Sequence, residues 1–119
     1  FRRIREIDFD SRVALIATVI QDGHEGVIAS ASYDQLGAGA AEVAFIVEED
    51  YQGLGIARRL LGHLGRIAVD RGLTSFEAEV LPHNRSMLRV FTACGWPMRT
   101  RTADGTVHVT LSLTASGGG

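Results

Sequence analysis

Residues 42–57, EVAFIVEEDYQGLGIA, constrain the fold of this chain more than any other stretch. The apolar run at 43–47 ends at acidic residues and indicates a strand, after which Gly53 and Gly55 lead into a long amphipathic segment. Glycines let a ligand approach the backbone, and the first N–H groups of a helix have no intrahelical acceptor. The stretch therefore predicts a strand, a loop and a helix N-terminus that binds an anion, most naturally a phosphate.

The glycine spacing narrows the kind of phosphate site. The Walker pattern is absent, because no glycine is followed directly by Lys-Ser/Thr, and Arg58-Arg59 stand three positions after Gly55. The dinucleotide pattern GxGxxG matches at Gly53 and Gly55 and fails at Arg58, and the acidic residue it needs further on would be Glu77 or Glu79. A nucleotide-binding module stays an alternative.

Hydrophobic periodicity and turn residues predict one α+β domain from the 119 residues. Two antiparallel strands are expected at 12–20 and 27–33 around the Asp22-Gly23 turn, and a third begins near Glu42. A helix at about 53–70, capped by Gly72, should connect that third strand to a parallel one at 73–81. The remaining elements are a helix at 84–93 and strands at 98–101 and 107–113, which the Asp104-Gly105 turn should join.

Composition limits the partners and the compartment. A hydrophobic content of 45% and a formal net charge of -2 give no reason to expect binding to nucleic acid or to an anionic membrane. The lone Cys94 cannot form an internal disulfide, so a cytoplasmic location is expected. No metal site is expected, because the histidines are scattered singly at His24, His63, His83 and His108.

Two motifs resemble the GNAT family of N-acetyltransferases. Gln52-Gly53-Leu54-Gly55-Ile56-Ala57 looks like the family's acetyl-CoA signature Q-x-x-G-x-A behind a strand. Residues 84–96, NRSMLRVFTACGW, are similar to the family's N-x-x-A-x-x-L-Y-x-x-x-G-F segment. The segments IREIDFD and LPHNRSMLRVF are similar to segments of bacterial Pat-type protein lysine acetyltransferases. In these enzymes the GNAT domain is fused to a regulatory module. The resemblance implies a single GNAT domain over 1–119 that lacks the family's first strand and is a fragment of a larger protein.

The resemblance also implies how acetyl-CoA, the cosubstrate, binds. Its pyrophosphate is expected on the backbone N–H groups of residues 52–57, with Arg58 adding charge and Asn84 contacting the pantetheine arm. The pantetheine should run beside a bulged strand at Phe45, Ile46 and Val47, where a freed N–H near Val47 stabilises the oxyanion. The same three side chains are also expected to pack in the core.

Glu42 is the expected general base, because acyl transfer needs a neutral amine and lysine is mostly protonated near pH 7. It stands immediately before an apolar run, so partial desolvation of its carboxylate is expected to favour proton uptake. The resemblance points to the same residue. The alternatives are an exposed glutamate with no role, and a base at Glu77 or, better, Glu79.

One residue departs from the family pattern. Phe91 stands where many relatives have a tyrosine that protonates the leaving thiolate, and phenylalanine has no proton to donate. Direct acetyl transfer to an amine, a protein lysine or a small amine, remains the leading interpretation, and catalysis through Cys94 is not expected. The alternative is a non-catalytic acyl-CoA-binding domain that regulates a larger protein.

Overall fold

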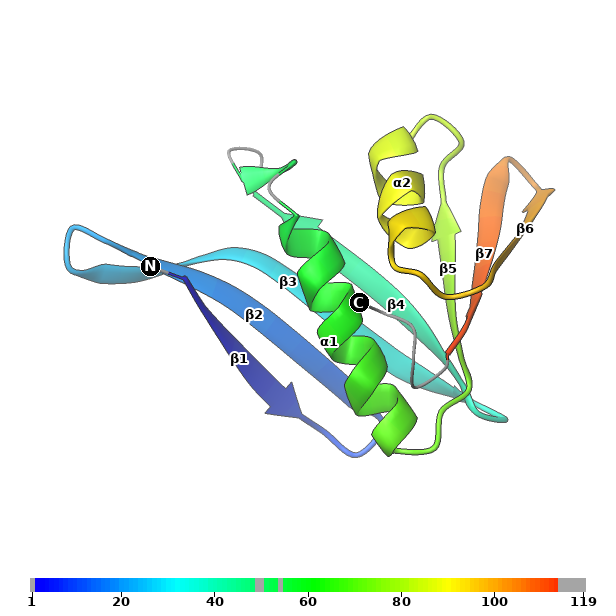
Figure 1. The fold of residues 1–119 in the computed structure, drawn as a ribbon, viewed down its shortest axis with the longest axis horizontal. Helices are drawn as coiled ribbons and strands as arrows, with labels where there is room; N and C mark the ends of the chain where they lie inside the picture. The colour runs from blue at the N-terminus through cyan, green and yellow to red at the C-terminus, as the bar shows by residue number, and fades with distance from the viewer. Residues whose placement is uncertain (1, 49–50, 54, 114–119) are drawn as a thin grey trace.

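The structure, a computed structural model, describes residues 2–48, 51–53 and 55–113. They form seven strands and two helices (Figure 1). The strands are β1 (Arg2–Asp8), β2 (Arg12–Gln21), β3 (His24–Gly37), β4 (Ala40–Val47), β5 (Ser75–Val80), β6 (Met98–Ala103) and β7 (Thr106–Ser112), and the helices are α1 (Ile56–Asp70) and α2 (Arg85–Ala93).

All strands join one mixed sheet in the order β1-β2-β3-β4-β5-β7-β6. Only the β4–β5 pair is parallel, as expected for two strands connected through a helix, and every other neighbouring pair is antiparallel. The hairpin turns at Asp22-Gly23 and Asp104-Gly105 have positive φ at both residues. This is the geometry that Asp-Gly favours in a two-residue hairpin, so both predicted turns are confirmed.

The segment before β2 forms a strand that the sequence pattern does not predict. Arg2–Asp8 forms β1 and pairs antiparallel with β2, from Arg2–Val19 to Asp8–Val13. Its charges hide the strand from pattern reading, because Arg3, Arg5 and Glu6 are exposed on an edge strand. The expectation that the family's own first strand is missing, and that the chain belongs to a larger protein, stays a prediction.

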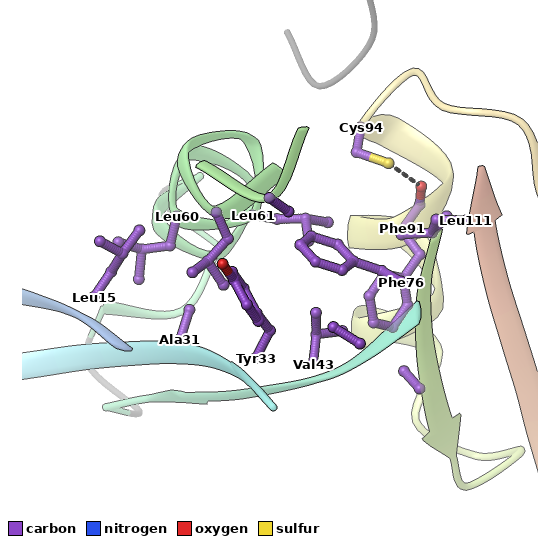
Figure 2. Close-up of a cluster of buried hydrophobic side chains, with 14 of the residues drawn as sticks. Leu15, Ala31, Tyr33, Val43, Leu60, Leu61, Phe76, Phe91, Cys94 and Leu111 are labelled. Atoms are coloured by element: carbon purple, nitrogen blue, oxygen red, sulfur yellow. Dashed lines mark hydrogen bonds between the residues drawn. The ribbon is translucent and has the colours of Figure 1, made fainter. Parts of the chain in front are cut away.

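Both helices pack on one face of the sheet. Residues at alternate positions of β2 to β5 are buried on this face. They pack against leucines of α1, such as Leu60 and Leu61, and against Phe91 of α2 (Figure 2). On β4 the buried residues are Ala41 and Val43, so Glu42, Ala44 and Ile46 point to the opposite face. Neither of the described helices covers that face, which is called the open face below.

Trp96, just after α2, fixes α2 against α1. It is 4% exposed, and a Cβ added at Gly65 of α1 would overlap its ring. Its ring also meets Phe76 of β5 edge-on, with centroids 6.2 Å apart. The glycine at 65 therefore sets how closely the two helices approach each other, and this fixes the position of α2 beside β4 and β5.

Candidate active site

The parallel strands β4 and β5 pair only briefly and then diverge (Figure 1). Their ladder joins Ala40 with Ser75, Ala41 with Phe76 and Glu42 with Glu77, and it ends there. On its other side β4 stays paired with β3 as far as Val47. The second half of β4 therefore has an edge with no strand partner among the described residues, and an extended ligand can pair with it.

The predicted bulge in β4 is wrong. The register between β3 and β4 runs without a shift from Ala41 to Val47, and the only irregularity lies near Gln35 and Gly37. The strand is splayed as expected, but β5 turns away from it and no extra residue is inserted.

Strand alternation shows which groups of β4 face the open edge. The N–H of Glu48 donates to the carbonyl of Ile28 across the β3 side, at 2.8 Å. Because backbone groups alternate along a strand, the N–H groups of Phe45 and Val47 point the other way. The carbonyl of Val47 accepts a hydrogen bond from the Gln52 side chain at 3.2 Å, so the loop is tied to the end of β4.

The loop before α1 has the geometry of an anion site. Gly53 and Gly55 have φ of 80° and 78°, and a Cβ at either position would meet no atom within 4 Å. Gly55 is the N-cap of α1 and makes no side-chain cap, so the N–H groups of Ile56 and Ala57 have no intrahelical acceptor. The helix begins at Ile56 and not at Gly53 as predicted, because residues with positive φ cannot continue a right-handed helix.

The loop, the end of β4 and the start of α2 enclose a pocket of ≈ 360 Å³. It is large enough for part of a small-molecule ligand. Its lining includes every residue predicted to bind the cosubstrate except Leu54, which lies outside the described residues: Phe45, Ile46, Val47, Gln52, Gly53, Gly55, Ile56, Ala57, Arg58 and Asn84. The structure thus brings together two sequence motifs that lie about thirty positions apart.

The pocket is also lined by four residues that were not predicted to bind a ligand: Tyr51, Ser86, Met87 and Val90. Met87 and Val90 are three residues apart, and Ser86 and Val90 are four apart, so they share a face of α2. That spacing after Asn84 was the available signal. No sequence signal pointed to Tyr51, because its position depends on the conformation of the loop. Its hydroxyl accepts a hydrogen bond from the Gln21 side chain at 2.9 Å.

Two predicted residues behave differently from expectation. Ile46 lines the pocket but is 73% exposed, so the prediction that it packs in the core is wrong, whereas Phe45 and Val47 do pack against the core. Asn84 is the N-cap of α2, and its side chain accepts from the N–H of Met87 at 3.2 Å. The contact of Asn84 with the pantetheine arm remains a prediction.

Glu42 lies on the open face at the point where β4 and β5 separate, outside the pocket lining. Its side chain is exposed, so the partial desolvation predicted from the sequence is wrong. Of the apolar residues that follow, the alternation of the strand sends Val43, Phe45 and Val47 to the other face, and Ala44 and Ile46 are themselves exposed. The neighbour in register is Glu77, and not Glu79.

Glu77 is held by a histidine. Its Oε1 lies 2.9 Å from Nε2 of His108 on β7, and the other ring nitrogen of His108 lies 3.9 Å from Glu79. The open face thus combines a solvent-exposed Glu42 with a neighbouring carboxylate that is already engaged. This arrangement leaves Glu42 as the carboxylate available to accept a proton at the end of the β4–β5 ladder.

Cys94 is buried at 1% exposure, and its thiol donates a hydrogen bond to the carbonyl of Phe91 at 2.8 Å (Figure 2). Burial raises the pKa of the Cys94 thiol, which keeps it protonated and a poor nucleophile. Within residues 2–48, 51–53 and 55–113, no group of three or more His, Cys, Asp or Glu side chains is placed to hold a metal ion. In the same ranges, neither helix has the length and apolar character needed to cross a membrane.

Comparison with known proteins identifies the family. The model of the acetyltransferase (GNAT) family matches residues 2–96. The acetyltransferase Pat of Mycolicibacterium smegmatis is 38% identical over 93 residues, which is 76% of this chain and 27% of that protein. The chain therefore spans about a quarter of the length of this curated relative.

Solved structures agree with that match. The crystal structure of the GNAT domain of S. lividans PAT superposes with a TM-score of 0.76 at 40% identity, covering 90% of this chain and 64% of that one. A cAMP-binding acyltransferase from Mycobacterium smegmatis gives a TM-score of 0.73 at 30% identity, covering 90% of this chain and 33% of that one. The predicted α+β fold and the resemblance to Pat-type GNAT domains are confirmed, and the chain belongs to the GNAT acetyltransferase family.

Proposed function

We propose that this domain is an acetyl-CoA-dependent N-acetyltransferase that transfers the acetyl group directly to an amine, with a protein lysine as the acceptor. The observation that carries the proposal is the pocket joining the uncapped N-terminus of α1 to the unpaired edge of β4. A phosphate suits the first feature and an extended amide-containing arm suits the second. Relatives named as Pat acetyltransferases support the lysine acceptor.

The residues of the pocket suggest the orientation of acetyl-CoA. The pyrophosphate accepts hydrogen bonds from the N–H groups of residues 52–57, and Arg58, which lines the pocket, adds positive charge. The pantetheine arm then runs along Val47, Ile46 and Phe45 toward Glu42 and also meets Asn84. This direction places the thioester near the point where β4 and β5 separate.

The oxyanion donor follows from distance along the strand. With a rise of about 3.3 Å per residue, the N–H of Val47 lies about 16 Å from Glu42, too far for both groups to act on one thioester. The N–H of Phe45 points to the same edge and lies about 10 Å from Glu42 by the same measure. We therefore assign the oxyanion donor to Phe45 in place of Val47.

The reaction needs one base. The acceptor amine approaches from the open face, where Glu42 takes a proton from it through an intervening water molecule. The amine nitrogen then attacks the thioester carbonyl carbon, the C–S bond breaks, coenzyme A leaves as a thiolate, and the new amide nitrogen loses its extra proton to water. A thiol has a pKa of about 8.5, so the thiolate is an adequate leaving group without an acid, which the phenylalanine at 91 cannot supply.

A second function is favoured by one observation. Phe91 is 1% exposed and has no proton to donate, which suits an acyl-CoA-binding regulatory domain without turnover. The relatives extend well beyond this chain, and one of them is a cAMP-binding acyltransferase, which suggests a regulatory domain as partner within a longer protein. A cytoplasmic location fits both functions.

Thiol release from acetyl-CoA, measured with amines and lysine-containing proteins, tests the proposal. The native chain should turn over, and Glu42→Gln should lower kcat by about a hundredfold or more. The affinity for coenzyme A, measured by calorimetry, should not change, because Glu42 lies outside the pocket lining. Tight binding of coenzyme A without turnover on any acceptor would support the regulatory domain, and absence of binding would contradict both functions.

A further inference from the structure

The end of the pocket that lies along β4, away from the glycine loop, is lined by Phe45, and a second aromatic ring backs it. Phe45 of β4 lines the pocket and meets Phe91 of α2 edge-on, with centroids 5.9 Å apart and an interplanar angle of 64°. Phe45 is half-buried, whereas Phe91 is 1% exposed. The Phe45 ring faces the pocket and Phe91, which is outside the pocket lining, packs behind it, while Met87 and Val90 of α2 also line the pocket.

Phe91 cannot move aside easily. Its carbonyl accepts hydrogen bonds from both the N–H and the thiol of Cys94, at 3.4 and 2.8 Å, which hold the last turn of α2. The following Trp96 is packed into the space left by Gly65 of α1. A close-packed wall of this kind resists the addition of even one methylene group.

We propose that the Phe45–Phe91 pair limits the site to short acyl groups, with acetyl accepted and longer chains excluded. The inference rests on the proposed function, which brings the thioester to Phe45. Neither ring has a hydrogen-bond partner for a charged acyl group such as succinyl, so the wall also selects against carboxylates. Phe91 then acts as the support of the wall, at the position where the family pattern has a tyrosine.

Calorimetry tests the proposed limit on acyl length without any need for turnover. It measures the affinities for coenzyme A and for its acetyl, propionyl and butyryl thioesters. The native chain should bind acetyl-CoA at least about tenfold more tightly than butyryl-CoA, since a hydrophobic pocket discriminates single methylenes by about 10- to 200-fold. Phe45→Ala should abolish that preference. Phe91→Leu should weaken it, because a smaller residue lets Phe45 retreat.

Phe76→Leu is the matched control. Phe76 is fully buried and packs on Tyr33 and Trp96, outside the pocket lining, so its loss should lower stability and leave the acyl preference unchanged. Equal affinities of the native chain for acetyl-CoA and butyryl-CoA would overturn this inference while leaving the proposed function intact. The same holds if Phe45→Ala keeps the native preference. A native chain that binds no coenzyme A at all would overturn both.

Discussion

Glu42 of β4 and Glu77 of β5 are partners in the last pair of a parallel ladder, and both side chains leave the sheet on its open face. Two carboxylates at one place raise the question of which accepts the proton. The hydrogen bond between Glu77 and His108, at 2.9 Å, distinguishes them. It holds Glu77 toward β7 and leaves Glu42 exposed at the point where the strands separate.

Glu77→Gln should therefore lower kcat by less than about tenfold, against about a hundredfold or more for Glu42→Gln. Steady-state turnover of acetyl-CoA with a fixed amine measures both. Glu79→Gln is the control, because Glu79 is 62% exposed at its side chain and is not in register with Glu42. A Glu77→Gln defect as large as that of Glu42→Gln would show that Glu77 is the base.

Gly55→Ala should weaken coenzyme A binding by about tenfold, because the new Cβ occupies space where the pyrophosphate approaches the backbone. The residue has φ of 78°, so the variant also loses about 1–2 kcal/mol of stability. Gly23→Ala separates the two effects, since Gly23 has φ of 79°, an equally open surrounding and a place in the β2–β3 turn. Equal affinities in the two variants would contradict an anion site at this loop.

Cys94 should resist alkylation by iodoacetamide in the native protein and react rapidly in denaturant, because the thiol is buried and its pKa is raised by desolvation. Cys94→Ala should keep the turnover of the native chain. Turnover that is lost in Cys94→Ala while the fold is retained would point to a covalent intermediate on this residue.

The raised pKa also predicts a pH effect on stability. Ionisation of Cys94 is easier in the unfolded chain, so the stability from the neutral buried thiol is complete below about pH 8.5. It falls as the pH rises from there through the higher folded-state pKa. Denaturant titrations should show a smaller loss over this range for Cys94→Ala than for the native chain.

Gly65→Ala should destabilise the protein by about 1–3 kcal/mol, although alanine favours a helix, because its Cβ would overlap the Trp96 ring. Trp96→Leu removes the overlapping ring and costs stability by itself, since Trp96 is 4% exposed. The double variant should lose less unfolding free energy than the two single variants lose together. Strict additivity in denaturant unfolding would contradict the packing argument.

The sequence by itself determined the local features. Asp22-Gly23 and Asp104-Gly105 form hairpin turns wherever the flanking residues are strands, and Gly53 and Gly55 place positive φ values just before a helix. The alternation in Ser75–Val80 and the three- and four-residue spacing in α1 likewise depend only on neighbours along the chain. These features were sufficient to predict every described element except β1, and the residues that the family resemblance named for the cosubstrate line one pocket, apart from Leu54 outside the described residues.

Only the tertiary structure decided how these elements meet. The charged segment Arg2–Asp8 becomes β1 because β2 offers it an edge. Glu42 is exposed beside Glu77, and Phe45 meets Phe91, because β4 and β5 separate after three pairs and α2 packs against α1 through Gly65 and Trp96. Such placements depend on pairing and packing between residues distant in sequence, which local periodicity does not encode.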